Sequence, residues 1–324
     1  MTKGLLTTSV GSFPKPDYLT VARNKHSRGE MSDHDLLKLE RQATQEWVRL
    51  QEELGIDILV DGEMYRGDMV EYFAQNMKGF KISGLVRSYG NRYYRKPIAV
   101  GPVGRTEAIT VAWWKYTQSL TNRPVKGMVT GPYTIADWSF NEYYPSREAF
   151  ILDLARAVHE EALDLEHAGA KYIQIDEPAI STRPEEMEVA SKALGIVTKG
   201  LKAHTITHIC YGDFSTIYPA MLGLPVDVID LEMVNSRYDT LELFKVTPFT
   251  KSLSLGVLDV HTHMVESLEE VKEGIRKGLA LVPADRLLID PDCGLKTRTV
   301  EEAQAKLRVM MQAVREVKRE KGLA

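Results

Sequence analysis

Two cysteines, a histidine and a glutamate give this sequence its most specific chemistry. His208 and Cys210 stand two residues apart, so on an extended strand both side chains point to the same face. Glu232 follows 22 residues after Cys210, and Cys293 is the only other cysteine among the 324 residues. An imidazole, two thiolates and a carboxylate form a suitable tetrahedral ligand set for Zn²⁺. The alternative is that both cysteines are small buried hydrophobes and that His208 is a core residue with satisfied hydrogen bonds.

A zinc site of this composition favours a thiol substrate. Two thiolates and a carboxylate give the site negative charge, which disfavours its use as a strong Lewis acid on water. Zinc deprotonates a bound thiol, whose free pKa is about 8.5, and electron-rich ligands keep the thiolate nucleophilic. The pattern therefore indicates a thiol that attacks an alkyl donor.

Other ionisable residues are candidates for proton transfer and substrate binding. His261 is a candidate proton donor, because an unperturbed imidazole has a pKa of about 6.5. Glu63 and Asp176 are candidates for holding a substrate ammonium group. The alternatives are an ordinary loop histidine and carboxylates that cap the following helices.

The elements that must position these residues follow a regular alternation. Helical periodicity predicts helices over residues 32–54, 146–168, 184–201, 267–281 and 300–320. Short β-branched segments predict eight strands, over residues 5–10, 56–60, 125–130, 172–176, 204–210, 226–232, 253–259 and 287–290.

Eight strands, nearly all followed by a helical pattern, predict an α/β fold, a (β/α)₈ TIM barrel in a single domain over residues 1–324. An open doubly wound sheet is the alternative, although no G-x-G-x-x-G follows the first strand. Residues 79–106 have β-type composition with turn signals and predict a β-hairpin inserted after the second βα unit. In a barrel the chemistry lies at the carboxyl ends of the strands, and Cys210, Glu232 and Cys293 all fall at predicted strand ends.

Composition excludes several classes of function. The formal net charge of −4 provides no basic field for nucleic acid or an anionic membrane surface. The N-terminus lacks the apolar run of a signal peptide, and no stretch approaches 18 apolar residues. Two cysteines are too few for a disulfide scaffold. We therefore expect a cytoplasmic enzyme with free thiols and with neither nucleic acid nor membrane as a partner.

The motifs together resemble the catalytic C-terminal half of the cobalamin-independent methionine synthase family. The resemblance runs nearly from end to end of the chain. Its main motifs are V-G-S-F-P at 10–14, D-G-E-M-Y-R-G-D-M-V-E-Y-F at 61–73, Y-I-Q-I-D-E-P-A at 172–179, T-H-I-C-Y at 207–211, D-V-H at 259–261 and D-P-D-C-G-L-K-T-R at 290–298.

The resemblance implies a (β/α)₈ barrel that methylates homocysteine to methionine, with zinc held by His208, Cys210, Glu232 and Cys293. It also implies that His261 is the proton donor and that Asp176 pairs with the ammonium group of homocysteine. The remaining implied contacts are Val10, Gly11, Ser12 and Glu63 for homocysteine, and Arg92, Tyr93 and Trp138 for the methyl donor.

Departures from the family pattern bear on the identity of that donor. The usual family member has about twice this length, Tyr93 stands where cysteine is common, and Ser181 or Thr182 stands where a folate-contacting acidic residue is expected. Short, single-barrel relatives in this family resemble enzymes that take the methyl group from a corrinoid donor. We therefore expect methylcobalamin or a methylated corrinoid protein as donor and partner. The alternatives are 5-methyltetrahydrofolate as donor, or a related zinc barrel that methylates another thiol such as coenzyme M.

Overall fold

The computed structural model describes residues 4–87 and 93–323. The chain forms two compact units, one made of Met1–Tyr65, Trp113–Lys126 and Asp230–Ala324, the other of Arg66–Ala112 and Gly127–Ile229. Within the described ranges, no helix is long and apolar enough to cross a membrane. The prediction of one domain over residues 1–324 stays a prediction.

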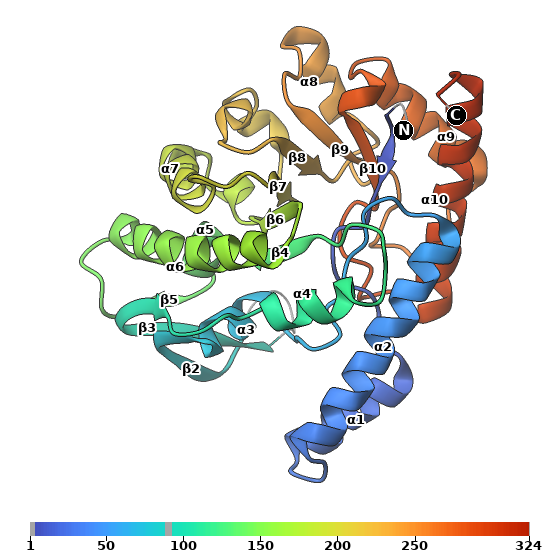
Figure 1. The fold of residues 1–324 in the computed structure, drawn as a ribbon. Coiled ribbons are helices and arrows are strands. Elements are labelled where there is room, and N and C mark those ends of the chain that lie inside the picture. Colours follow the sequence, from blue (N-terminus) through green and yellow to red (C-terminus); the bar gives the residue numbers. More distant parts are fainter. Residues whose placement is uncertain (1–3, 88–92, 324) are drawn as a thin grey trace. The chain divides into compact units, whose positions relative to one another are not determined.

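The first unit combines three parallel strands with long amphipathic helices. Its strands pair in the order β1, β10, β9, and α9 and α10 lie side by side (Figure 1). Its elements are β1 (Leu6–Thr7), α1 (Asp17–Ser27), α2 (Asp33–Leu54), α8 (Thr240–Val246), β9 (Ser252–Gly256), α9 (Leu268–Leu279), the 3₁₀ turn η5 (Ala284–Arg286), β10 (Leu287–Asp290) and α10 (Val300–Glu320).

The second unit contains another set of parallel strands, β4, β6 and β7, and a separate small sheet. Two further elements, α4 (Val111–Gln118) and β8 (Val228–Leu231), cross the boundary along the chain. The elements of this unit are α3 (Met69–Gln75), β2 (Met77–Arg87), β3 (Tyr93–Arg105), β4 (Gly127–Thr130), α5 (Pro132–Asp137), β5 (Phe140–Asn141), α6 (Arg147–Ala168), β6 (Tyr172–Asp176), η1 (Ile180–Thr182), η2 (Pro184–Glu186), α7 (Met187–Val197), β7 (His204–Ile209), η3 (Phe214–Thr216) and η4 (Ala220–Gly223).

Seven of the eight predicted strands form one sheet in the order β1-β10-β9-β8-β7-β6-β4, which confirms the predicted α/β barrel class. The eighth predicted strand, 56–60, is not a regular strand. Ile58 donates to the carbonyl of Thr7, and Lys126 donates to the carbonyl of Leu59, so the segment is bonded on both sides. The side chain of Gln51 takes both backbone groups of Val60, at 2.9 Å each, and therefore interrupts the ladder.

The helix boundaries follow local capping chemistry. Ser32 caps α2 by accepting the amide of Asp35, and Gly55 ends that helix in the left-handed region at φ 85°. Ser267 and Thr299 each begin a helix with a capping box. These three predicted helix starts are confirmed. The helix predicted to begin at Pro184 begins instead at Met187, because two 3₁₀ turns precede it.

The predicted inserted hairpin is present as the antiparallel pair β2 and β3. Its first strand begins at Met77, two residues before the predicted segment. The register shifts beside Gly79, whose φ is +87° and where a Cβ would lie 2.5 Å from the carbonyl oxygen of Pro102. Only glycine allows this close approach of the two strands. The short strand β5 pairs with β3 and completes a three-stranded sheet.

Candidate metal and substrate site

The end of β7 carries two of the predicted zinc ligands. His208 lies within the strand, Cys210 follows its last residue, and both are buried. The amide of Glu177 donates to the carbonyl of His208 over 2.9 Å, which extends the ladder between β6 and β7. Asp176, the last residue of β6, is the register partner of His208. The predicted ammonium-binding carboxylate and a predicted zinc ligand therefore lie opposite each other near the carboxyl ends of neighbouring strands.

Glu232 directly follows β8 and is held by its own loop. Its side chain is buried, and Asn235 donates from Nδ2 to Oε1 over 2.8 Å. The carboxylate of Asp292 accepts the backbone amides of Met233, Val234 and Asn235 at 2.9–3.0 Å. Burial raises the pKa of Asp292 to about 7, against the opposing effect of these three donors. Because Asp292 adjoins Cys293, these bonds join the loop of one predicted ligand to the loop of another.

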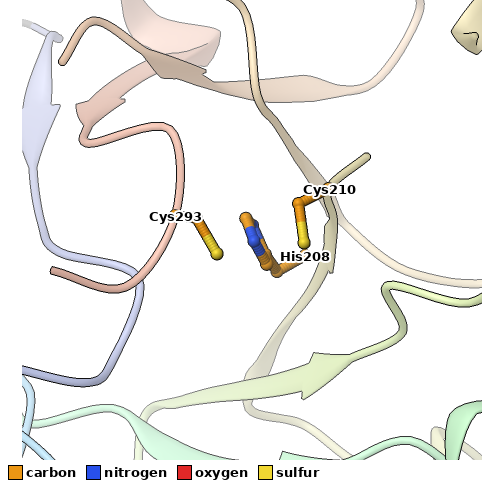
Figure 2. A group of neighbouring side chains, drawn as sticks. All are labelled: His208, Cys210 and Cys293. Atoms are coloured by element: carbon orange, nitrogen blue, oxygen red, sulfur yellow. The ribbon is translucent and has the colours of Figure 1, made fainter. Parts of the chain in front are cut away.

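Three of the four predicted ligands form a group with metal-binding composition. His208, Cys210 and Cys293 each offer one donor atom, and these atoms lie within 4.8 Å of one another. Figure 2 shows the imidazole and the two thiols directed toward a common point. Among the described residues, Glu232 lies outside this group. One nitrogen and two sulfur donors are a chemical match for Zn²⁺, which leaves a position for a further ligand.

His261 lies in the loop after β9 and is partly exposed. Its backbone amide donates to Oδ1 of Asp259 over 2.7 Å, and its Nε2 atom is 3.5 Å from Oε2 of Glu232. The bond to Glu232 raises the pKa of His261, whereas burial opposes the shift. The predicted proton donor is thus close to a predicted ligand and still reaches solvent.

The predicted homocysteine contacts of the first unit lie on adjoining segments. Ser12 and Gly62 form a parallel bridge, and Glu63 follows with φ 58°. The carbonyl of Ser12 also accepts the amide of Leu295 over 2.7 Å. A Cβ at Gly294 would lie 2.1 Å from Oγ of Ser12, so a side chain there would require the Ser12 hydroxyl to turn away. The structure therefore brings Val10, Gly11, Ser12 and Glu63 close to the loop that carries Cys293.

The predicted donor contacts lie at the small sheet of the second unit or outside the described residues. Arg92 lies outside the described residues. Tyr93 begins β3 and is 57% exposed, whereas Trp138 directly follows α5, two residues before β5. Because β5 pairs with β3 at Ile98, Tyr93 lies five residues away, or about 16 Å along the strand. Trp138 precedes the paired residue Phe140 by two residues, so both predicted contacts come before the pairing of β3 with β5 along the chain.

Sequence reasoning missed the residues that support the predicted ligand Glu232. Asn235 orients Glu232, and Asp292 fixes the loop behind it. The spacing of three residues between Glu232 and Asn235, and the position of Asp292 beside Cys293, were the available signals. Ser181, one of the two residues standing where an acidic family residue was expected, is buried and donates to the carbonyl of Tyr211 over 2.6 Å.

The fold and this donor group define the class as a parallel α/β barrel with a candidate thiolate metal site. The chain belongs to the family of the cobalamin-independent synthase catalytic domain, which residues 5–316 match. It is 40% identical to a methionine synthase of Saccharolobus solfataricus, over 98% of this chain and 96% of that protein. It is also 40% identical to a 5-methyltetrahydropteroyltriglutamate–homocysteine methyltransferase of Mycobacterium bovis, over 97% of this chain but only 43% of that protein.

A solved structure shares the fold over almost all of both chains. The B12-independent methionine synthase of Shewanella sp. W3-18-1, in complex with selenomethionine, matches with a TM-score of 0.87 and 29% identity, covering 99% of each chain. The chain is thus a member of an enzyme family whose named relatives are methionine synthases and homocysteine methyltransferases.

The expectation of methylcobalamin or a methylated corrinoid protein as methyl donor is wrong. The family is cobalamin-independent, and the M. bovis relative is named for a methylated pteroyltriglutamate. The expectation depended largely on a short chain. The Shewanella protein is B12-independent although this chain covers 99% of it, so a single-barrel length does not indicate a corrinoid donor.

Proposed function

We propose that this protein is a zinc-dependent homocysteine methyltransferase that forms methionine from a 5-methyltetrahydropteroyl polyglutamate. The observation that supports this most directly is the group of His208, Cys210 and Cys293, with donor atoms within 4.8 Å of one another. Family membership supports the substrate and the donor. The runner-up, methylation of another thiol, has no observation in its favour.

His208, Cys210, Cys293 and Glu232 would hold the metal. Bound Zn²⁺ would lower the pKa of a coordinated homocysteine thiol below its free value of about 8.5. The two thiolates keep the site electron-rich. Asn235 holds one oxygen of Glu232 and thereby orients the carboxylate as a ligand.

The amino-acid end of homocysteine would bind to carboxylates and backbone groups beside the metal ligands. Asp176, the register partner of His208, would pair with the ammonium group, and Glu63 would add a second carboxylate. Val10, Gly11 and Ser12 would contact the remaining part of the amino acid from the adjoining segment. This arrangement orients the sulfur for attack on the donor methyl group.

His261 would complete the transfer. The sulfur forms a bond to the methyl carbon, the bond from that carbon to N5 of the folate breaks, and the electron pair remains on N5. Nε2 of His261 would supply the proton that N5 takes as the methyl leaves. Trp138, Tyr93 at the start of β3, and Arg92 are proposed contacts of the folate.

Turnover with a defined donor tests this function. Zinc-loaded protein is incubated with homocysteine and 5-methyltetrahydropteroyltriglutamate, and methionine is measured by mass spectrometry. We expect methionine in proportion to enzyme, and Asp176→Asn should raise KM for homocysteine. Absence of methionine from protein that contains stoichiometric zinc would refute the proposal. X-ray absorption adds a second readout, because a catalytic site gains a sulfur ligand when homocysteine binds.

A further inference from the structure

A fully buried lysine contacts the loop that carries His261. Lys306 belongs to α10 and has no exposed surface. An ammonium group without water is stabilised only when its charge is paired and its N–H groups all find acceptors. Lys306 meets both conditions, since Nζ lies 2.9 Å from each carboxylate oxygen of Glu266 and also donates to the carbonyl of Met264.

Glu266 connects this lysine to the other end of the loop. It directly precedes Ser267, the N-cap of α9, and its Oε1 atom accepts the amide of Asp259 over 2.8 Å. This bond closes the segment 259–266 between its first and last residues. Oδ1 of Asp259 then accepts the amide of His261 over 2.7 Å. A continuous set of hydrogen bonds therefore runs from Lys306 to the backbone of His261.

A second contact from α10 reaches the same loop. Glu302 lies four residues before Lys306, on the same side of the helix, and its carboxylate is 2.9 Å from Nδ1 of His263. The first two turns of α10 thus contact the loop at His263, Met264 and Glu266. The loop in turn carries His261 to within 3.5 Å of Glu232.

An apolar side chain at position 306 would fill the core without the desolvation cost of a charge. The lysine adds what an apolar residue cannot, namely three directed bonds to one loop. We infer that Lys306 and Glu266 are positioning residues that fix the loop 259–266 and so hold His261 in place at the methyl-transfer site. This inference rests on the proposed function for its effect on turnover.

The test compares Lys306→Met with Lys272→Met. Lys272 pairs with Glu316 and Glu320 between α9 and α10, so its variant removes an ion pair from the same two helices without touching the loop. A catalytic group misplaced by about 1 Å can lose about a hundredfold in rate. We expect kcat to fall by about ten- to a hundredfold in Lys306→Met, with KM for homocysteine within about twofold and zinc content unchanged. Lys272→Met should keep the parent kcat.

The double variant Lys306→Met/Glu266→Gln separates positioning from stability. It removes the buried charge that the single variant leaves unpaired, so part of the lost stability should return. The amide oxygen still accepts from Asp259, but the bond to α10 is gone. We expect kcat to stay low even though stability recovers. Recovery of kcat together with stability would overturn the inference.

Hydrogen exchange of residues 259–266 gives a readout that does not depend on activity. We expect faster exchange of these amides in Lys306→Met and in the double variant than in Lys272→Met. Faster exchange together with an inactive parent protein would support the loop anchor and refute the proposed function. Unchanged exchange together with an active parent would overturn the anchor and leave the proposed function in place.

Discussion

Asn235 donates a hydrogen bond from Nδ2 to Oε1 of Glu232 over 2.8 Å, across one turn of the loop that follows β8. The bond fixes the orientation of a buried carboxylate whose other oxygen lies 3.5 Å from His261. A group that orients a ligand commonly changes metal affinity by about 10- to 100-fold when it is removed.

Asn235→Ala should therefore weaken zinc binding by about tenfold, because the Glu232 carboxylate loses the partner that orients it. Zinc affinity is measured by competition with a chromophoric chelator. Ser236→Ala is the matched control, since its hydroxyl bonds only to the carbonyl of Met233 in the same loop. Equal zinc affinity in both variants would contradict an orienting role for Asn235.

Substitutions of Asp292 should destabilise the protein in a graded order. Oδ1 accepts two of the three loop amides and Oδ2 accepts the third. Asp292→Asn keeps an acceptor for two of them and should lower the free energy of unfolding by about 2 kcal/mol, whereas Asp292→Ala loses all three and should lower it further. Urea unfolding of chelator-treated protein measures the effect without a contribution from zinc. A loss in Asp292→Ala no larger than that in Asp292→Asn would be evidence against this account.

The carboxyl group of Glu40 should make stability depend on pH. It is buried between α1 and α2, and burial raises its pKa to about 7 despite Arg23 at 2.7 Å. A raised pKa means that the folded state binds the proton more tightly than the unfolded chain. The stabilisation is therefore complete below pH 4.5 and is lost as the pH rises through 7, by at most about 3 kcal/mol.

Glu40→Gln remains neutral at every pH and should abolish this dependence. The free energy of unfolding of the parent minus that of the variant should fall between pH 5 and pH 8. Chemical denaturation at several pH values measures the difference, with the exposed Glu53→Gln of the same helix as control. A difference that is constant across this range would mean that Glu40 is ionised throughout.

The sequence predicted those parts of the fold that depend on local chemistry. Helix α10 was predicted over residues 300–320, as observed, because its apolar period and its flanking residues are all local signals. Segment 56–60 carries the composition of a strand, yet Gln51 from the preceding helix takes both backbone groups of Val60. A side chain that takes backbone hydrogen bonds from the sheet makes a tertiary contact. The hydrophobic periodicity of the sequence does not predict such a contact.

The candidate site also has residues that local sequence predicts and residues that it does not. His208 and Cys210 were predictable because the period of a strand places both on one face. Asp292 was not, since its role depends on amides 57–59 residues away in the sequence. The donor was predicted wrongly because chain length and a few substitutions do not encode it. Ser181 donates a hydrogen bond to the carbonyl of Tyr211, so the serine at this position is not evidence for or against folate binding.

Cys210→Ser and Cys293→Ser should each lose zinc and methionine formation together. A serine hydroxyl is a far weaker ligand for a borderline-soft ion than a thiolate, because it remains protonated near neutral pH. Zinc per chain is measured by elemental analysis and methionine by mass spectrometry. His204→Gln changes an exposed residue at the start of the strand that carries His208, and it should keep both zinc and activity. Stoichiometric zinc in both cysteine variants would contradict this prediction, because it would show that the two thiols do not hold the metal.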